Sequence, residues 1–126
     1  MDEYIEKYLT DILISINEVE SYFVKGNMRY SDFINDTLRQ RAVERNIEII
    51  GEAVNRILKI EPAFELAKAR AIVNTRNKVI HGYDSVTVDF LWGLVINHIP
   101  SLKNEVENLL NKGLIISKRP GPAKVE

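Results

Sequence analysis

The 126-residue chain contains no cysteine and only two histidines. The absence of cysteine excludes disulfide bonds, thiolate metal ligands and a thiol nucleophile. No apolar run approaches the roughly 20 residues that a membrane-spanning helix needs. The first residues, MDEYIEKYLTD, are acidic and periodic, unlike a secretory signal peptide. We therefore expect a cytoplasmic protein with no membrane contact.

Sequence motifs of several common enzyme classes are also missing. The chain has no GxGxxG or GxxxxGKS/T loop for nucleotide phosphates, and no GxSxG nucleophile elbow. His81 has no second histidine or carboxylate at a helical spacing that suits a metal ion. The sequence therefore predicts no metal site and no bound cofactor.

The charges are unevenly distributed, although the net charge is only −1. Residues 1–36 carry 3 basic and 8 acidic side chains, whereas residues 37–83 carry 9 basic and 5 acidic ones. The positive middle segment is compatible with a local anion-binding face, and also with ordinary solvated helix faces. Charge alone does not decide between the two.

The apolar residues recur at spacings of three and four, which predicts amphipathic helices. A first helix covers the stripe from Ile5 to Phe23, and Gly26 is placed to end it. A short helical turn is expected within YSDFIND (30–36). A second long helix is predicted to begin at Thr37, with Gln40 completing a capping box, and to end at the Ile60–Pro62 boundary.

The second half of the chain predicts two further helices. One covers Glu65–His81 and is ended by Gly82; the other is capped by Thr87 and interrupted near Pro100. Four principal helices with short connections predict an all-α, antiparallel up-and-down four-helix bundle over residues 1–112. The composition changes at Gly113, so residues 113–126 are expected to form a flexible tail.

The strongest candidate for a functional site is the polar cluster RNKVIHGYD (76–84) at the end of the third predicted helix. Asn77 and His81 are four residues apart and share a helix face. Arg76 lies about 140° around the helix from His81, but its long side chain can reach the same helix end. Gly82 would direct Tyr83 out of the following turn.

This cluster has two interpretations. Histidine transfers protons near neutral pH and arginine binds phosphate through paired donors, so the residues suit chemistry on a phosphate. The same residue types also suit an ordinary helix end, where they bond the last carbonyls and interact favourably with the helix dipole. His98 lies in the apolar run LVINHIP, and it is expected to pack, as are Phe90 and Trp92.

A metal-free RNA cleavage reaction makes specific demands on such a site. It needs a base for the 2′-hydroxyl, an acid for the leaving 5′-oxygen and positive charge at the phosphate. One histidine cannot easily perform both proton transfers in a single step. Two copies related by a twofold axis would supply two histidines and two arginines. If this cluster is the site of a nuclease, we therefore expect a composite site at a homodimer interface.

The order of several segments resembles a known family. RNKVIHGY fits the RxxxxHxY motif of the HEPN superfamily. RNIEIIGEA (45–53), IVNTRNKVIHGYDSV (72–86) and DFLWGLVINHIPSLKNEV (89–106) resemble successive segments of its HepT-like branch. Members of the HepT-like branch are toxins encoded beside a minimal nucleotidyltransferase. The likeness extends over roughly residues 4–110.

The resemblance implies a homodimeric helical bundle that cleaves RNA without a metal ion. By this likeness Arg76 would hold and neutralise the scissile phosphate, His81 would transfer protons, and Asn77 would orient the phosphate or the histidine. Tyr83 matches the tyrosine that the nucleotidyltransferase antitoxin modifies with AMP. We therefore expect the toxin of a toxin–antitoxin pair, with RNA as substrate.

Three further residues, Arg45, Glu48 and Glu52, match the pattern of the branch and are candidates for a supporting role. Two other functions stay open. The chain could be a non-catalytic helical subunit that binds substrate or nucleotide for a nucleotidyltransferase, or a purely structural helical dimer.

Overall fold

The computed structural model describes residues 1–23, 29–81 and 87–118, and for residues 75–81 and 114–118 it describes the backbone alone. The described chain forms α1 (Glu3–Ser21), α2 (Tyr30–Ile34), α3 (Thr37–Ile60), α4 (Ala67–His81), α5 (Val88–Gly93), the π-helical segment η2 (Leu94–His98) and α6 (Ile99–Lys118). These ranges contain no strand, which confirms the all-α prediction.

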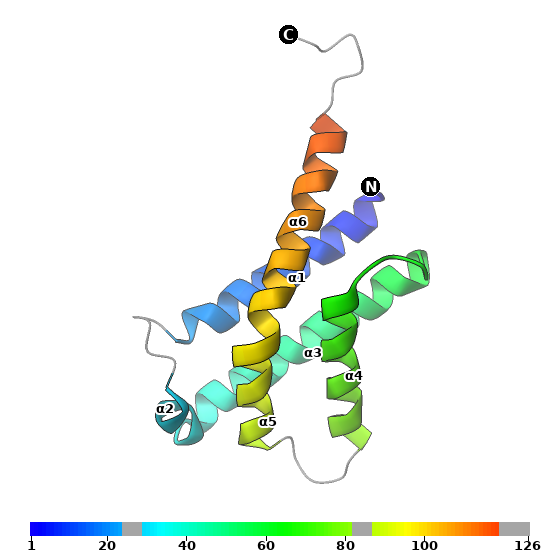
Figure 1. The fold of residues 1–126 in the computed structure, drawn as a ribbon. Helices are drawn as coiled ribbons and strands as arrows, with labels where there is room; N and C mark the ends of the chain where they lie inside the picture. Colours follow the sequence, from blue (N-terminus) through cyan, green and yellow to red (C-terminus); the bar gives the residue numbers. More distant parts are fainter. Residues whose placement is uncertain (24–28, 82–86, 119–126) are drawn as a thin grey trace.

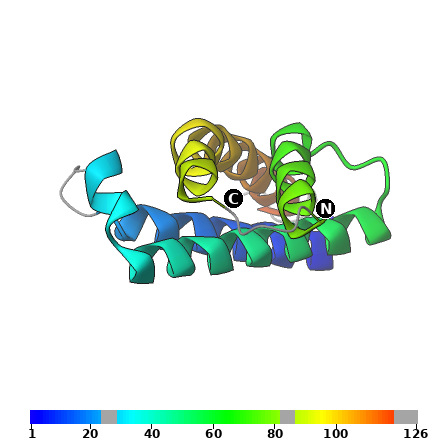
Figure 2. The ribbon, with the colours of Figure 1, turned by 90° about the horizontal axis from the view of Figure 1, so that it is seen from below.

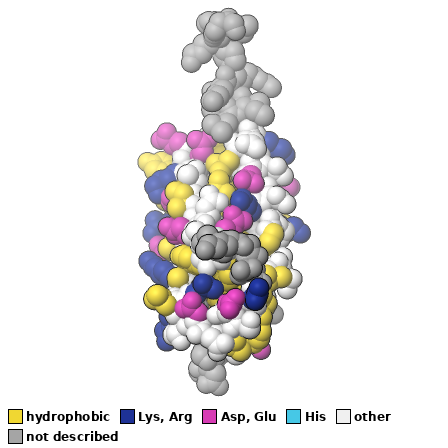
Figure 3. All heavy atoms as spheres, turned by 90° about the vertical axis from the view of Figure 1, so that its left-hand side faces the viewer, with side chains coloured by type: hydrophobic (Ala, Val, Ile, Leu, Met, Phe, Trp, Pro, Cys, Tyr) yellow, Lys and Arg dark blue, Asp and Glu magenta, His cyan; other side chains and the backbone are white. Residues whose placement is uncertain are grey.

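The helices pack in two layers. α1 and α3 lie side by side and antiparallel in one layer, and α4 and the continuous α5–η2–α6 rod form the second layer across them (Figures 1 and 2). This arrangement confirms the predicted helical bundle. Within the described ranges, none of the helices is both long and apolar enough to cross a membrane. The surface in Figure 3 intersperses acidic and basic side chains with apolar ones.

The core lies between the two layers and is built from the predicted apolar stripes. The stripe of α1 is buried from Ile5 to Phe23, and every member is at most 4% exposed. α3 contributes residues that are fully buried: Val43, Ile50, Val54 and Ile57. Burying each such side chain contributes about 1.5–3 kcal/mol, so these stripes position the helices.

α3 begins at Thr37, as predicted, but the hydrogen bonds that cap it differ from the prediction. The N-cap is Asp36, whose carboxylate accepts a hydrogen bond from the backbone N–H of Arg39 at 3.0 Å. The amide of Gln40 donates to the backbone oxygen of Phe33 at 2.8 Å instead of reaching back to the helix start. The predicted Thr37–Gln40 capping box is therefore wrong, because Asp36 caps one residue earlier and α2 offers Gln40 a free carbonyl.

The last helical rod confirms one predicted feature and refines another. The Thr87 hydroxyl caps α5 by accepting from the N–H of Phe90 at 3.2 Å, as predicted. The interruption expected near Pro100 takes the form of the π-helical segment Leu94–His98. Pro100 has no N–H to bond the carbonyl of Ile96, which explains why the α-helical hydrogen-bond pattern changes here.

Two predicted helix boundaries shift. α4 begins at Ala67, two residues after the predicted start at Glu65. α6 continues through Gly113 to Lys118, past the predicted boundary at residue 112. Gly113 is buried against α1, where a Cβ atom would lie 3.1 Å from Cε of Met1. The predicted ends at Gly26 and Gly82, and the tail from residue 119, lie outside the described residues.

The N-terminus of α4 is capped by a different helix. The Glu105 carboxylate on α6 accepts hydrogen bonds from the backbone N–H of Lys68 at 3.1 Å and from that of Ala69 at 3.2 Å. The Arg70 guanidinium donates to the backbone oxygen of Pro62 at 3.0 Å, which ties α4 to the preceding connection. The two contacts hold the start of α4 against its neighbours.

A polar network centred on the buried Asn46 links α1 to α3. The Tyr22 hydroxyl donates to Oδ1 of Asn46 at 2.6 Å, and Nδ2 of Asn46 donates to the Glu18 carboxylate at 2.8 Å. Asn46 is only 2% exposed. Burial raises the pKa of Tyr22 and the negative charge of Glu18 raises it further, so the phenol stays a donor. The network fixes the register of the two helices.

We predict that Asn46→Ala lowers the free energy of unfolding by about 1–3 kcal/mol, because it leaves Tyr22 and Glu18 without their partner. Urea denaturation followed by circular dichroism measures the change. Asn55→Ala, at an exposed position of the same helix, is the matched control and should shift stability by less than about 0.5 kcal/mol. Equal shifts for the two variants would contradict the proposed role of the network.

Glu105→Ala should lower the free energy of unfolding by about 1 kcal/mol, since two N–H groups at the start of α4 lose their acceptor. Glu105→Gln keeps an acceptor oxygen but removes the charge, and it should lie between wild type and Glu105→Ala. Thermal denaturation of the three proteins tests this order. If Glu105→Ala is as stable as wild type, the hydrogen bonds from α4 to Glu105 contribute nothing to the free energy of unfolding.

Candidate functional site

The candidate motif lies on the last part of α4, which stays helical to His81. The backbone therefore places Asn77 and His81 on one face. Arg70 and Asn74 share this face at helical spacings, and both are exposed. Asn77 and His81 thus continue a polar stripe that begins on the solvent side of the helix.

Arg76 occupies a different position in the helical register. It follows Ala69, Ile72 and Val73 at spacings of seven, four and three, and these three residues are buried. The α4 backbone thus separates Arg76 from His81 by about 140°. The two residues do not share a helix face within one copy of α4, so their convergence depends on the reach of arginine or on a second copy.

The side chains of Arg76, Asn77 and His81 belong to the part of α4 that is described by its backbone alone, and Tyr83 lies outside the described residues. Their roles therefore stay predictions. What the structure does describe is how α4 is held. Its anchor, Glu105, escapes sequence reasoning because it is 37 residues from Lys68 and no local motif marks it.

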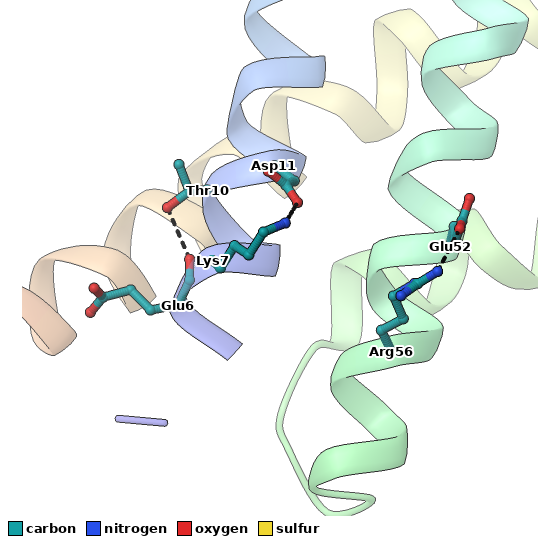
Figure 4. Close-up of polar contacts among 6 residues, drawn as sticks. All are labelled: Glu6, Lys7, Thr10, Asp11, Glu52 and Arg56. Carbon is teal, nitrogen blue, oxygen red and sulfur yellow. Dashed lines mark hydrogen bonds and ion pairs between the residues drawn. The ribbon is translucent and has the colours of Figure 1, made fainter. Parts of the chain in front are cut away.

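The three supporting candidates on α3 do not form one cluster. Nη1 of Arg45 lies 3.4 Å from the Glu48 carboxylate. Glu52 instead pairs with Arg56, at 3.1 Å (Figure 4). Both pairs are exposed, and exposed ion pairs contribute only about 0–1 kcal/mol. Sequence reasoning had not singled out Arg56, although its spacing of four residues from Glu52 is typical of a helical ion pair.

The aromatic residues of the last rod serve packing, as predicted. Trp92 contacts the rings of Phe33, Tyr30 and Phe23, at centroid distances of 5.6, 5.9 and 6.1 Å. The Tyr30 hydroxyl also donates to the Asp89 carboxylate. His98 lies half-buried on η2, and among the described contacts its ring has no polar partner.

A metal ion would need a group of acidic or histidine side chains as its ligands. In the part of the chain that the structure describes, no three histidine, aspartate or glutamate side chains group closely enough to hold a metal ion. The described features are thus a polar stripe on α4, an anchor at its start and two exposed ion pairs on α3.

Known proteins resemble this chain over most of its length. The family model "Ribonuclease HepT-like" matches residues 12–109, which include every candidate site residue. The "Probable ribonuclease HepT" of Thermococcus cleftensis is 37% identical over 106 residues, covering 81% of this chain and 92% of that protein. A "Putative RNase" of Methanocaldococcus jannaschii is 36% identical over 104 residues, covering 82% and 94% respectively.

A third relative, a "Putative RNase" of Caldanaerobacter subterraneus subsp. tengcongensis, is 34% identical over 90 residues, covering 71% of this chain and 80% of that protein. No solved structure matches the chain at a significant level. The family match and these relatives confirm the resemblance seen in the motif segments. The chain therefore belongs to the HepT-like ribonuclease family of the HEPN superfamily.

Proposed function

We propose that this protein is a metal-independent endoribonuclease whose composite site combines Arg76 and His81 of two protomers. We further propose that it is the toxin of a toxin–antitoxin pair. The observation that carries the proposal is the match to the HepT-like ribonuclease family across the RxxxxHxY segment. The ribonuclease names of the relatives support the same reaction class.

The proposed reaction is an internal transesterification. His81 of one protomer accepts the proton of a ribose 2′-hydroxyl, and that oxygen attacks the adjacent phosphorus. The partner's His81 donates a proton to the 5′-oxygen as its bond to phosphorus breaks, leaving a 2′,3′-cyclic phosphate. Arg76 stabilises the negative charge that develops on the phosphate, and Asn77 orients the reacting groups.

The geometry of α4 favours a site shared by two protomers. His81 continues an exposed polar stripe, whereas Arg76 follows the buried stripe of the same helix. The backbone of one α4 therefore places the two residues at positions about 140° apart around the helix. A second copy doubles both groups, and it also provides the acid and the base that one histidine cannot supply together.

Tyr83 supplies a means of control. In the proposed inactivation its hydroxyl oxygen attacks the α-phosphorus of ATP on the nucleotidyltransferase antitoxin. A phosphodiester bond to AMP forms, pyrophosphate leaves, and the phenol proton passes to solvent. The added phosphate places negative charge next to a site built for RNA phosphate, so it repels the substrate.

We predict that purified protein cleaves single-stranded RNA in the presence of EDTA, and that His81→Ala and Arg76→Ala each lower the rate by at least about 100-fold. Gel analysis of end-labelled RNA measures the rate. His98→Gln is the matched control, because it removes the other histidine and should keep most of the activity.

Two outcomes would count against this proposal. Equal cleavage by wild type, His81→Ala and Arg76→Ala would refute the catalytic assignment. Absence of cleavage by wild type, together with tight binding to the nucleotidyltransferase, would indicate the non-catalytic subunit instead.

Incubation with the nucleotidyltransferase and ATP should raise the mass of the protein by one or more AMP units and reduce RNA cleavage. Intact-mass spectrometry detects the addition. Tyr83→Phe should show no increase, whereas Tyr4→Phe, which changes an exposed tyrosine on α1, should be modified like wild type. A mass increase that persists in Tyr83→Phe would place the modification on another of the five tyrosines or on a different side chain.

A further inference from the structure

The outer surface of the α1–α3 layer carries an open groove. Figure 2 shows this layer with α4 and α6 on its other side. The groove has a volume of about 420 Å³ and is lined from both helices, including Lys7, Asp11 and Ile14 of α1. A second hollow of about 550 Å³, lined by Tyr8, Arg56 and Ile60 among others, lies beside it. Arg76, Asn77 and His81 line neither hollow, whereas Glu52, a candidate for a supporting role, lines both.

The side chains along this face follow a regular order. α1 and α3 are antiparallel, so steps of three or four residues forward on α1 match equal steps backward on α3. The resulting four bands, one per helical turn, are a first apolar band (Tyr4, Ile60), a cationic band (Lys7, Arg56), an acidic band (Asp11, Glu52) and a second apolar band (Ile14, Ile49).

The cationic band is continuous across the groove. Nζ of Lys7 lies 5.1 Å from the ring centroid of Tyr8, and Cζ of Arg56 lies 5.9 Å from the same centroid. Each cation is paired with the acidic band on its own helix: Lys7 with Asp11 at 2.9 Å and Arg56 with Glu52 at 3.1 Å. Figure 4 shows the two ion pairs on the two sides of the groove.

The apolar bands are exposed to an extent that burial within one chain does not explain. Tyr4 is 59% exposed, Ile14 52% and Ile60 43%. These side chains lie on either side of the charged bands. Exposed apolar side chains beside polar groups mark a surface that can contact another protein.

We propose that this face binds the same face of a second copy about a twofold axis that passes between the cationic and acidic bands. Such an axis reverses the order of the bands. The cationic band of one copy then meets the acidic band of the other, and each first apolar band meets a second apolar band. The pattern is self-complementary in both charge and polarity, as a twofold interface requires.

The charges of the groove favour this partner. The main groove has three carboxylates, from Asp11, Glu18 and Glu52, against two cations, so it does not attract a polyanion such as RNA. The 19 residues of α1 make the face about 28 Å long, and two adjacent helices make it about 20 Å wide. That footprint of roughly 560 Å² is below the surface of about 800 Å² per partner that a standard interface buries, so it corresponds to a small interface.

The ion pairs leave the charges available for a partner. The side chains of Lys7 and Arg56 are 62% and 55% exposed. Ion pairs between exposed side chains contribute little to the stability of a single chain. A facing copy surrounds each cation with carboxylates from both chains. This interface lies on the layer opposite α4, so it would join one catalytic pair to another and is independent of the proposed cleavage site.

Two variants with uniform charge test the proposal. Asp11→Lys/Glu52→Lys makes both charged bands positive, and Lys7→Glu/Arg56→Glu makes both negative. Each variant should repel its own copy, so light scattering after size exclusion should give half the wild-type mass. An equimolar mixture of the two should regain the wild-type mass, because the positive face then meets the negative one. Lys68→Glu/Lys112→Glu, at exposed positions outside the bands, should keep the wild-type mass.

Circular dichroism confirms that each variant is folded. Wild-type mass in both uniform variants, or a mixture that does not reassociate, would overturn the interface. Association of this face only after the nucleotidyltransferase is added would assign it to that partner and would also overturn the proposal. RNA cleavage by wild type and by Lys7→Glu/Arg56→Glu, which keeps Glu52, reports separately on the proposed function.

Discussion

Burial of the apolar stripe of α3 is the constraint on which the rest of the structure depends. This helix contacts α1, α2, α4 and α5. Its fully buried residues form one side of the core, and Asn46 locks its register against α1 through Tyr22 and Glu18. Since α4 packs on α3, the placement of the motif helix depends on this burial.

The motif helix α4 is held by contacts near its start. Its described buried residues, Ala69, Ile72 and Val73, lie in its first half. There Glu105 caps its start, and Arg70 bonds the preceding connection. His81 is 12 residues beyond Ala69, which corresponds to about 18 Å along the helix axis. Because the start of α4 is held, the direction of its axis toward His81 is fixed.

The two layers of the bundle present different chemistry to the solvent. The α4 layer carries the exposed residues Arg70 and Asn74, and the proposed site residues Asn77 and His81 follow them in the helical register. The α1–α3 layer carries alternating bands of apolar, basic and acidic side chains, which suit a second protein surface. The proposed interface and the proposed cleavage residues of α4 lie on opposite layers, so the proposed association would leave α4 uncovered.

The sequence by itself determined the helices and the motif, because a periodic apolar stripe and a local spacing such as Arg76 to His81 are properties of neighbouring residues. The cap of α5 by Thr87 and the interruption before Pro100 were predictable for the same reason. Only the tertiary structure decided that Glu105 caps α4, that α2 draws Gln40 away from a capping box, and that Lys7 and Arg56 meet at Tyr8. These contacts join residues distant in the chain, so their geometry exists only once the apolar stripes have packed.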